Sequence, residues 1–218
     1  VIDGKGWRSG ATIQRKEIPQ WFLKITAYSD ELLDSIDSLE SWPSSVKLMQ
    51  KNWIGKSKGV RVIFKILESK KTLDVYTTRI DTIYGVTFLA ISPNHSMIKN
   101  ILNFKSEIKS FINQCSSLKV SEETMGNIEK KGIDSGIRAV NPVNGEVVPV
   151  WIANYILSDY GTGCVMSVPG HDDRDNEFAK KYNLPIIEVI KSKKSDKDQQ
   201  NVFTDDGILV RSGKYTGL

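Results

Sequence analysis

The sequence predicts a mixed β protein with attached helices, whose strands form an antiparallel or mixed barrel. From Gly59 onward, short apolar and β-branched runs recur between turn residues, which is typical of strands. Asn144-Gly145 separates two such runs and is the strongest short hairpin signal in the chain. The chain has no internal repeat and no regular alternation of strand and helix, which disfavours a parallel α/β sheet.

Length and composition are those of an ordinary globular protein. The chain has 218 residues, 39% hydrophobic and 26% charged, which predicts one or two soluble domains. No apolar run approaches the roughly 20 residues of a membrane span, and the start is neither basic nor apolar enough for a secretory signal. Since the chain also begins without Met, we expect it to be a piece of a longer polypeptide.

Residues 1–55 differ from the rest and are expected to form a connecting arm that leads into a domain of residues 56–218. Gln20–Ile25 is an apolar run of strand or extended type. Ser29–Leu39 has helical spacing that ends before Trp42-Pro43, because the residue before proline is pushed out of the α region. One face of this helix would carry Leu32, Leu33, Ile36 and Leu39, and a second short helix would pass through Val46, Leu48 and Met49.

The remaining elements follow the same signals. The expected strands are Val60–Leu67 paired with Thr72–Thr78, then Val86–Ile91, the hairpin within Ile137–Val150, Val147–Ile156, Cys164–Val168, Ile186–Ile190 and Gly207–Arg211. The expected helices are Met97–Leu102, Ser106–Gln114 and Asp172–Tyr182. The last of these begins with acids and ends with Lys180-Lys181, which matches the helix dipole.

Charge and cysteine content exclude little. The net charge of +4 permits a polyanionic partner without requiring one, and Lys191–Lys197 is typical of a solvated loop. Cys115 and Cys164 lie in no CxxC pair, which argues against zinc and against a disulfide framework and fits a reducing cytosol.

The first stretch with candidate chemistry is Thr77–Thr82, at the predicted end of a strand. It contains three threonine hydroxyls, the Arg79 guanidinium and the Asp81 carboxylate. Hydroxyls and backbone N–H groups there could hold a water and stabilise an oxyanion as an ester is attacked. Composition alone favours the alternative of a turn in which Thr and Asp satisfy local backbone groups.

The second stretch is Tyr160–Asp175, a glycine-rich turn, a buried strand, a Pro-Gly break and an acidic helix start. Asp172 and Asp175 share a helix face, and a carboxylate there could take an ammonium group. The alternative is helix capping, which explains Asp172 or Asp173 well and Asp175 less well. A metal bound by His171 and these acids is disfavoured, because there is only one local histidine.

Together the two stretches resemble the editing domains of leucyl-tRNA synthetases. Thr77–Thr82 is similar to their threonine-rich motif, and Tyr160–Asp175 to their GTG…VPGHD…RD motif. The flanks Trp21–Thr26, Met49–Gly55 and Glu129–Gly132 resemble the bacterial and organellar type. The HIGH and KMSKS signatures of aminoacylation are missing. The resemblance therefore implies the inserted editing part alone, folded as a closed six-stranded β-barrel decorated by helices.

The resemblance implies an aminoacyl-tRNA deacylase. It would hydrolyse the ester joining a wrong amino acid to the 3′ end of leucine tRNA, with norvaline and isoleucine as expected amino acids and methionine as a further candidate. Asp175 would bind the α-ammonium group, and Thr82 would keep the correct leucine from seating. By the same resemblance, Thr77, Thr78 and Arg79 would line the ester, Tyr160, Met166 and Val168 would shape the pocket, and His171 and Asp172 would support its wall.

No metal and no cofactor is implied for this part of the chain, because ATP and Mg²⁺ serve the aminoacylation core of such synthetases. The implied partners are the charged 3′ end of leucine tRNA and the rest of the synthetase, with no membrane, in a monomer of the cytoplasm or an organelle matrix. The rival is an RNA-binding appendage that positions the acceptor end without hydrolysis. Ile80 stands where the family usually has proline, and Cys164 and Ser167 where alanines are common.

Overall fold

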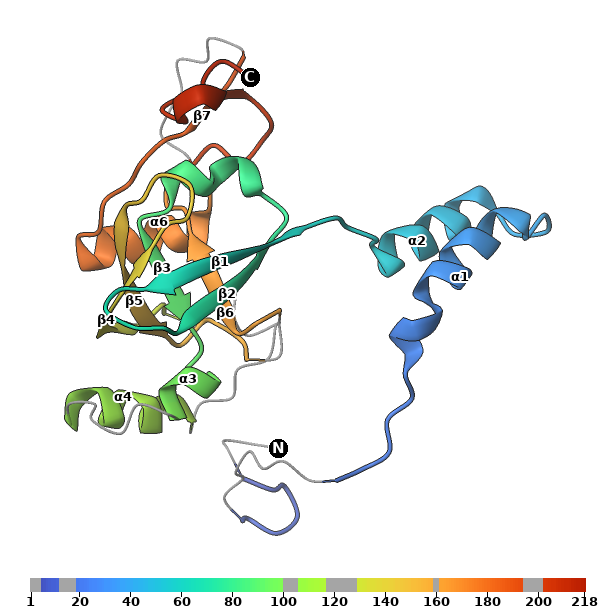
Figure 1. Cartoon of the computed structure of the whole chain (residues 1–218). Helices are drawn as coiled ribbons and strands as arrows, with labels where there is room; N and C mark the ends of the chain where they lie inside the picture. The colour runs from blue at the N-terminus through green and yellow to red at the C-terminus, as the bar shows by residue number, and fades with distance from the viewer. Residues whose placement is uncertain (1–4, 12–18, 100–105, 117–128, 159–160, 194–201) are drawn as a thin grey trace. The chain divides into compact units, whose positions relative to one another are not determined.

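The computed structural model describes residues 5–11, 19–99, 106–116, 129–158, 161–193 and 202–218 (Figure 1). The chain forms two compact units, one of Gln14–Lys58 and one of Val1–Ile13 with Gly59–Leu218. The predicted arm, residues 1–55, and the unit Gln14–Lys58 begin 13 residues apart and end three residues apart.

The smaller unit consists of short helices. These are η1 (Ile25–Tyr28), α1 (Ser29–Ser35), η2 (Ile36–Ser38) and α2 (Ser44–Ile54). Residues 19–24 form no strand and Ile25 belongs to η1, so of the predicted strand or extended run Gln20–Ile25 the strand alternative is wrong. The predicted helix over Ser29–Leu39 is present but tightens into a 3₁₀ turn at Ile36. Helix α2 ends at Gly55, whose φ of 57° is the left-handed conformation that terminates helices.

The larger unit is built on a six-stranded mixed sheet with the order β2-β1-β4-β5-β3-β6. Its strands are β1 (Val60–Ile66), β2 (Thr72–Thr77), β3 (Phe88–Ile91), β4 (Gly132–Val140), β5 (Val147–Ala153) and β6 (Cys164–Ser167). Neighbours are antiparallel except β3 and β5, which are parallel. Both predicted hairpins, β1–β2 and β4–β5, are confirmed. At the two ends of the order, the Thr162 hydroxyl, just before β6, donates to the Asp74 carbonyl of β2.

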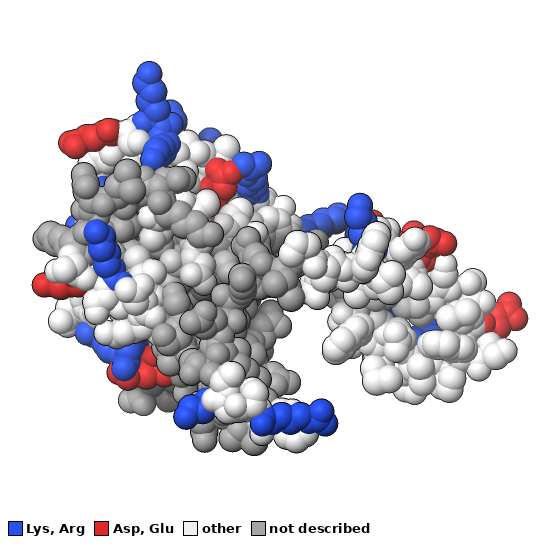
Figure 2. All heavy atoms as spheres, turned by 90° about the horizontal axis from the view of Figure 1, so that it is seen from below, with Lys and Arg blue, Asp and Glu red and all other residues white. Residues whose placement is uncertain are grey.

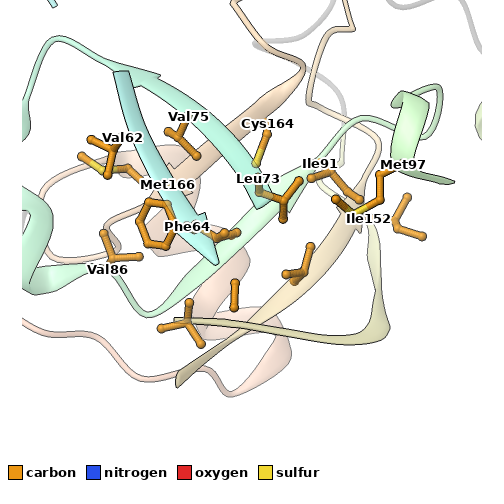
Figure 3. Packing of buried hydrophobic residues seen from close by; sticks show 14 of the residues in the cluster. Val62, Phe64, Leu73, Val75, Val86, Ile91, Met97, Ile152, Cys164 and Met166 are labelled. Atoms are coloured by element: carbon orange, nitrogen blue, oxygen red, sulfur yellow. The ribbon is translucent and has the colours of Figure 1, made fainter. Parts of the chain in front are cut away.

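Strand β3 is buried on both faces and separates two hydrophobic clusters. Leu89 and Ile91 belong to the larger cluster with Phe64, Leu73, Val75 and Val150 (Figure 3). Phe88 and Ala90 belong to the smaller one, where the Phe88 ring stacks on the ring of Phe178 in helix α6 (Asp173–Tyr182), with 5.2 Å between the ring centroids. Because successive side chains of a strand point to opposite faces, one strand serves both clusters. Helix α6 is thereby packed against the sheet.

The other elements are α3 (Ser96–Lys99), α4 (Ser106–Ser116), α6 (Asp173–Tyr182), β7 (Ile190–Lys191), β8 (Ile208–Leu209) and η4 (Gly213–Tyr215). Positions 100–102 of the predicted helix Met97–Leu102 lie outside the described residues. Positions 194–197 of the predicted loop Lys191–Lys197 lie outside them as well. None of the helices in the described ranges combines the length and apolar character that a membrane span needs.

The predicted strand Ile186–Ile190 is wrong over most of its length. Only Ile190 pairs, with Leu209 of β8. The backbone N–H groups of Val189 and Ile190 donate to the ring of His171 instead of to a long strand ladder. The apolar run therefore reflects burial of Val189 and Ile190, and not an extended β ladder.

Candidate functional site

A cavity of about 570 Å³ lies where the end of β2 and η3 (Ile80–Gly85) meet β6 and the start of α6. Every predicted site residue that the structure describes lines it. These are Thr77, Thr78, Arg79, Thr82, Met166, Val168, His171, Asp172 and Asp175. Tyr160 lies outside the described residues. The structure thus brings together two stretches that are about eighty residues apart in the chain.

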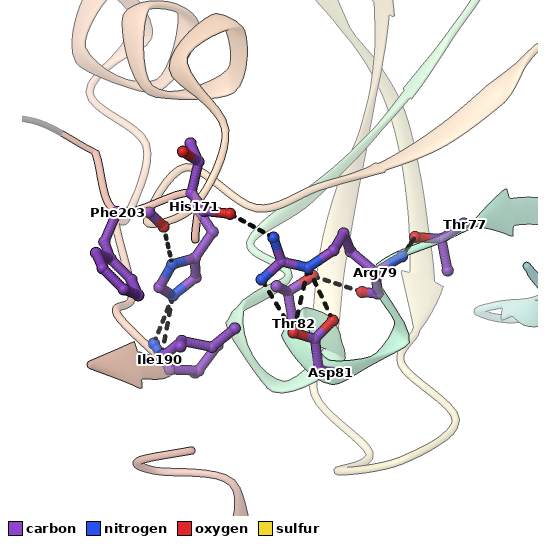
Figure 4. A network of polar contacts seen from close by, with 9 residues as sticks. Thr77, Arg79, Asp81, Thr82, His171, Ile190 and Phe203 are labelled. Carbon is purple, nitrogen blue, oxygen red and sulfur yellow. Dashed lines mark hydrogen bonds and ion pairs between the residues drawn. The ribbon is translucent and has the colours of Figure 1, made fainter. Parts of the chain in front are cut away.

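The threonines of the first stretch hold its backbone. Thr77 Oγ1 accepts the N–H of Arg79 at 3.0 Å, and the Thr82 hydroxyl donates to the Arg79 carbonyl at 2.8 Å (Figure 4). Both bonds are the local turn bonds that composition favoured. Thr82 is nonetheless buried and lines the cavity. Because its hydroxyl is bonded to the Arg79 carbonyl, the methyl group is the part of the side chain that makes no hydrogen bond.

The Arg79 guanidinium is held by two partners. Nε and Nη2 bind the Asp81 carboxylate at 3.0 to 3.2 Å, and Nη1 donates to the Thr204 carbonyl at 2.6 Å (Figure 4). The hydrogen bond to Asp81 raises the pKa of Arg79, and the charges of Asp205 and Asp206 add to the rise. Arg79 therefore ties η3 to the segment around Thr204.

The His171 ring uses both of its nitrogens on backbone groups. Nε2 accepts the N–H groups of Val189 at 2.8 Å and Ile190 at 3.1 Å, so the proton belongs on Nδ1, which donates to the Phe203 carbonyl at 2.8 Å. Burial lowers the pKa of His171, which keeps the ring neutral. His171 supports the wall from behind, with neither nitrogen free to coordinate a ligand.

Within the described ranges, no three His, Cys, Asp or Glu side chains are grouped so that they could hold a metal ion. The acids at the start of α6 have other partners.

Asp172 is the N-cap of α6, which confirms the capping interpretation for this residue. Its Oδ1 accepts the backbone N–H groups of Arg174 at 2.9 Å and Asp175 at 3.1 Å. Its Oδ2 pairs with the Arg174 guanidinium at 3.1 Å. The Asp172 carboxylate is therefore occupied by the helix that it begins.

Asp175 differs from Asp172 because its carboxylate is 6% exposed and takes part in none of the ion pairs among the described residues. Oδ2 accepts the Val168 N–H at 2.9 Å, and the Tyr155 hydroxyl donates to Oδ1 at 3.4 Å. Burial, followed by the negative charge of Asp172, raises the pKa of Asp175 to about 7. The site thus holds a buried acid that makes no ion pair, although the positive charge of Arg174 lowers its pKa.

Six lining residues were not predicted: Tyr76, Tyr155, Ile156, Leu157, Val165 and Arg174. Arg174 lies inside the second stretch, and its pairing with Asp172 could have been expected from their spacing. Tyr155, Ile156 and Leu157 follow β5, and nothing in their local pattern indicates that the sheet places them beside Asp175. Ile156 and Leu157 add apolar side chains to the lining of the cavity.

The chain is similar to known proteins along its whole length. The family model described as leucyl-tRNA synthetase, editing domain, matches residues 51–218. The leucine–tRNA ligases of Marinobacter nauticus and Francisella philomiragia are 50% and 52% identical to the chain over its whole length. The chain spans about a quarter of these relatives, 26% and 27% of their lengths.

A solved structure is also similar. The crystal structure of the ternary complex of Agrobacterium radiobacter K84 agnB2 LeuRS with tRNA and LeuAMS matches with a TM-score of 0.68 and 40% identity. The match covers 93% of this chain and 24% of that one.

Proposed function

Because the chain belongs to the family of leucyl-tRNA synthetase editing domains, we propose that it hydrolyses the ester of leucine tRNA charged with a wrong amino acid. Norvaline and isoleucine are the proposed amino acids, and methionine is a further candidate. The observation that carries the proposal is the buried Asp175 side chain, which lines the cavity and makes no ion pair, while the nearby Arg174 is paired with Asp172. An aminoacyl ester brings a free α-ammonium group, which is the missing partner.

The carboxylates of Asp172 and Asp175 differ in how many of their hydrogen-bond acceptor sites remain unoccupied. A carboxylate has about four acceptor sites, and those of Asp172 are taken by two backbone N–H groups and a guanidinium. Asp175 has one backbone donor and one hydroxyl donor. An ammonium group would fill the remaining sites with charge-assisted hydrogen bonds. It would also lower the pKa of Asp175, since an opposite charge favours the ionised form.

Amino-acid selection is assigned to Thr82. One methylene in a hydrophobic pocket discriminates by only about 1–3 kcal/mol, so a second site that excludes the correct leucine by shape multiplies the selectivity. The hydroxyl of Thr82 is fixed on the Arg79 carbonyl, so the side chain has one rotamer and a fixed bulk at the cavity wall. Met166 and Val168 supply apolar surface for the accepted side chain.

Water is the proposed nucleophile, so no nucleophilic triad is needed. Thr77, Thr78 and Arg79 line the reacting ester in this proposal, and a free hydroxyl of the terminal ribose assists the water. Neither nitrogen of His171 is available as a base. A site that works by positioning and by polar contact to the developing oxyanion fits this set of residues.

Barrel closure and the division of the chain into an arm and a domain extend the proposal. We propose that the sheet closes into a six-stranded barrel, which the hydrogen bond from Thr162 to Asp74 between its two end strands supports. We also keep the division into an arm of residues 1–55 and a deacylase domain of residues 56–218, in a monomer of the cytoplasm or an organelle matrix.

The smaller unit is proposed to contact the rest of the ligase. It exposes an unusual amount of apolar surface: Trp21 is 102% and Trp53 88% exposed. The part of this surface that Figure 2 shows is largely uncharged. Large exposed apolar patches mark protein interaction sites, and the relatives are about four times as long as the chain.

The test is single-turnover deacylation of leucine tRNA charged with isoleucine. Asp175→Ala should lower the rate about 30-fold or more, because leaving a buried charge without its partner costs roughly 2–5 kcal/mol. Asp173→Ala is the matched control, since Asp173 is exposed, two residues away and not part of the cavity wall. Wild-type rates in Asp175→Ala would contradict the assignment. A wild type that binds the tRNA without hydrolysing it would favour the RNA-binding appendage.

A further inference from the structure

Tyr155 is a buried tyrosine beside the acid that the proposed function depends on. It follows β5, is 4% exposed and lines the cavity. Its ring packs against Phe178 with a centroid distance of 5.6 Å, and its hydroxyl lies 3.4 Å from Asp175 Oδ1. The ring is held by the smaller hydrophobic cluster, which fixes the position of the hydroxyl.

Toward the ionised Asp175 carboxylate, the hydroxyl can act only as a donor. Burial, together with the negative charge of Asp175, raises the pKa of Tyr155 far above its ordinary value, so the phenol keeps its proton at every relevant pH. An ionised carboxylate is an acceptor only. The direction of the hydrogen bond is therefore set by chemistry as well as by distance.

Two hydrogen bonds from residues that follow different strands hold the Asp175 carboxylate, and the Ser167 hydroxyl also lowers its pKa. The Val168 N–H, at the end of β6, binds Oδ2 at 2.9 Å, and the Tyr155 hydroxyl, after β5, binds Oδ1. One donor on each oxygen fixes the plane of the carboxylate and leaves the other lone pairs for a ligand. A backbone donor cannot be removed by a substitution at its own side chain, whereas the tyrosine hydroxyl can.

We propose that Tyr155 is a positioning residue, which orients the Asp175 carboxylate toward the α-ammonium group of the aminoacyl ester. This inference rests on the proposed function, because it assigns the ammonium group to Asp175. Tyr155 does not touch the reacting ester, and it acts only through Asp175. It was not among the residues that the sequence pointed to.

The first measurement is steady-state deacylation of isoleucine-charged leucine tRNA by the whole chain. Tyr155→Phe keeps the ring and removes the donor, so KM should rise about threefold to tenfold, the range of one net hydrogen bond. The change in kcat should be smaller, because the ammonium contact is made in both the bound substrate and the transition state.

Tyr182→Phe is the matched control. The Tyr182 ring lies in the same cluster, 4.5 Å from the Phe178 ring, but its hydroxyl accepts the Gly132 N–H at 2.9 Å and does not line the cavity. Its KM should stay at the wild-type value. An equal rise of KM in both variants would overturn the proposal, since the effect would then come from the shared cluster.

The second measurement is independent of activity. The ¹³C resonance of the Asp175 carboxyl group, identified by its loss in Asp175→Asn, is titrated in the wild type and both tyrosine variants. The charged groups that face Asp175 are Asp172 and Arg174, and the Ser167 hydroxyl also favours its ionised form; all remain in every variant. Tyr155→Phe should raise the pKa of Asp175, because an ionised carboxylate loses a donor, and Tyr182→Phe should leave it unchanged.

The outcomes separate the two ideas. An unchanged Asp175 titration and KM in Tyr155→Phe overturn the positioning role, even when Asp175→Ala is inactive and the proposed function holds. A wild type without deacylase activity overturns the proposed function, and the positioning role that depends on it falls in the same assay. Wild-type activity, with a raised KM and a raised Asp175 pKa in Tyr155→Phe alone, supports both.

Discussion

The two walls of the cavity use similar polar residues in opposite ways. In the Thr77–Thr82 wall, the hydroxyls of Thr77 and Thr82 are bonded to backbone groups, and the Arg79 guanidinium is bonded to Asp81 and to the Thr204 carbonyl, which fixes a tight turn. In the α6 wall, Asp172 is used in the same structural manner as the helix cap. Asp175, in contrast, is buried and takes part in none of the ion pairs among the described residues.

The polar residues of the two stretches therefore fall into two groups. Some hold the local backbone in place by hydrogen bonds, and others have acceptor sites left for a ligand. A polar group with every acceptor or donor occupied holds the wall in place. A buried polar group with unoccupied acceptor sites destabilises the fold while the site is empty, and a bound ligand that fills these sites removes that cost. The predictions below test this division from the largest expected effect to the smallest.

Thr82→Ala should make the chain hydrolyse correctly charged leucine tRNA. Removing the fixed bulk at the wall opens the pocket, and a discrimination of about 1–3 kcal/mol corresponds to a gain of roughly 10- to 200-fold. The measurement is the deacylation rate with leucine tRNA charged with leucine. Thr87→Ala, which empties a buried threonine position away from the cavity, should not show the gain. If Thr82→Ala still spares this substrate, size selection belongs to another residue.

Substrate capture should strengthen as pH rises through about 7, the raised pKa of Asp175. The ammonium group needs the ionised carboxylate, so kcat/KM should fall about tenfold per pH unit below this pKa. It is measured as a pH profile of deacylation. A profile that is flat across this window would remove Asp175 from ammonium binding.

The stability of the fold should respond in the opposite direction. The folded pKa of Asp175 lies above its ordinary 3.8, so burying this acid favours the fold most below 3.8, and this contribution is lost as pH rises through about 7. Asp175→Asn should lack this loss of stability. Urea unfolding of both proteins at several pH values measures it, and identical pH trends would contradict it.

Asp172→Ala should reduce stability by about 0.5–2 kcal/mol, the usual cost of an N-cap, while deacylation falls less than in Asp175→Ala. The free energy of unfolding in urea measures the first effect. Asp173→Ala serves as the control, because Asp173 interacts with the helix dipole but caps no N–H group. Equal destabilisation by both substitutions would deny the special role of the cap.

Removing transition metals should change nothing. The described residues contain no suitable group of metal ligands, and the proposed nucleophile is a water placed by the site and the ribose hydroxyl. Treatment with 1,10-phenanthroline, which leaves the Mg²⁺ that tRNA needs, should leave the deacylation rate unchanged. A clear loss that added zinc restores would require a metal site.

Much of the fold could be predicted because its signals are local. The hairpin around Asn144-Gly145 follows from a turn that needs a positive φ, and Gly145 has a φ of 76°. Helix α6 follows from its acidic start and basic end. The strand expected over Ile186–Ile190 was wrong because a distant ring, that of His171, takes the N–H groups that the pattern assigned to a ladder.

By itself, the sequence determined the hairpins, the acidic start of α6 and the two polar stretches, because short-range periodicity and turn chemistry specify them. Their gathering in one cavity was expected only from a family resemblance, since no local pattern fixes which strand ends meet. The tertiary structure identified Asp172 as the acid that caps the helix, where the sequence had left Asp172 and Asp173 open. It also brought Tyr155 to Asp175, because hydrogen bonding between distant segments depends on how the sheet packs against α6.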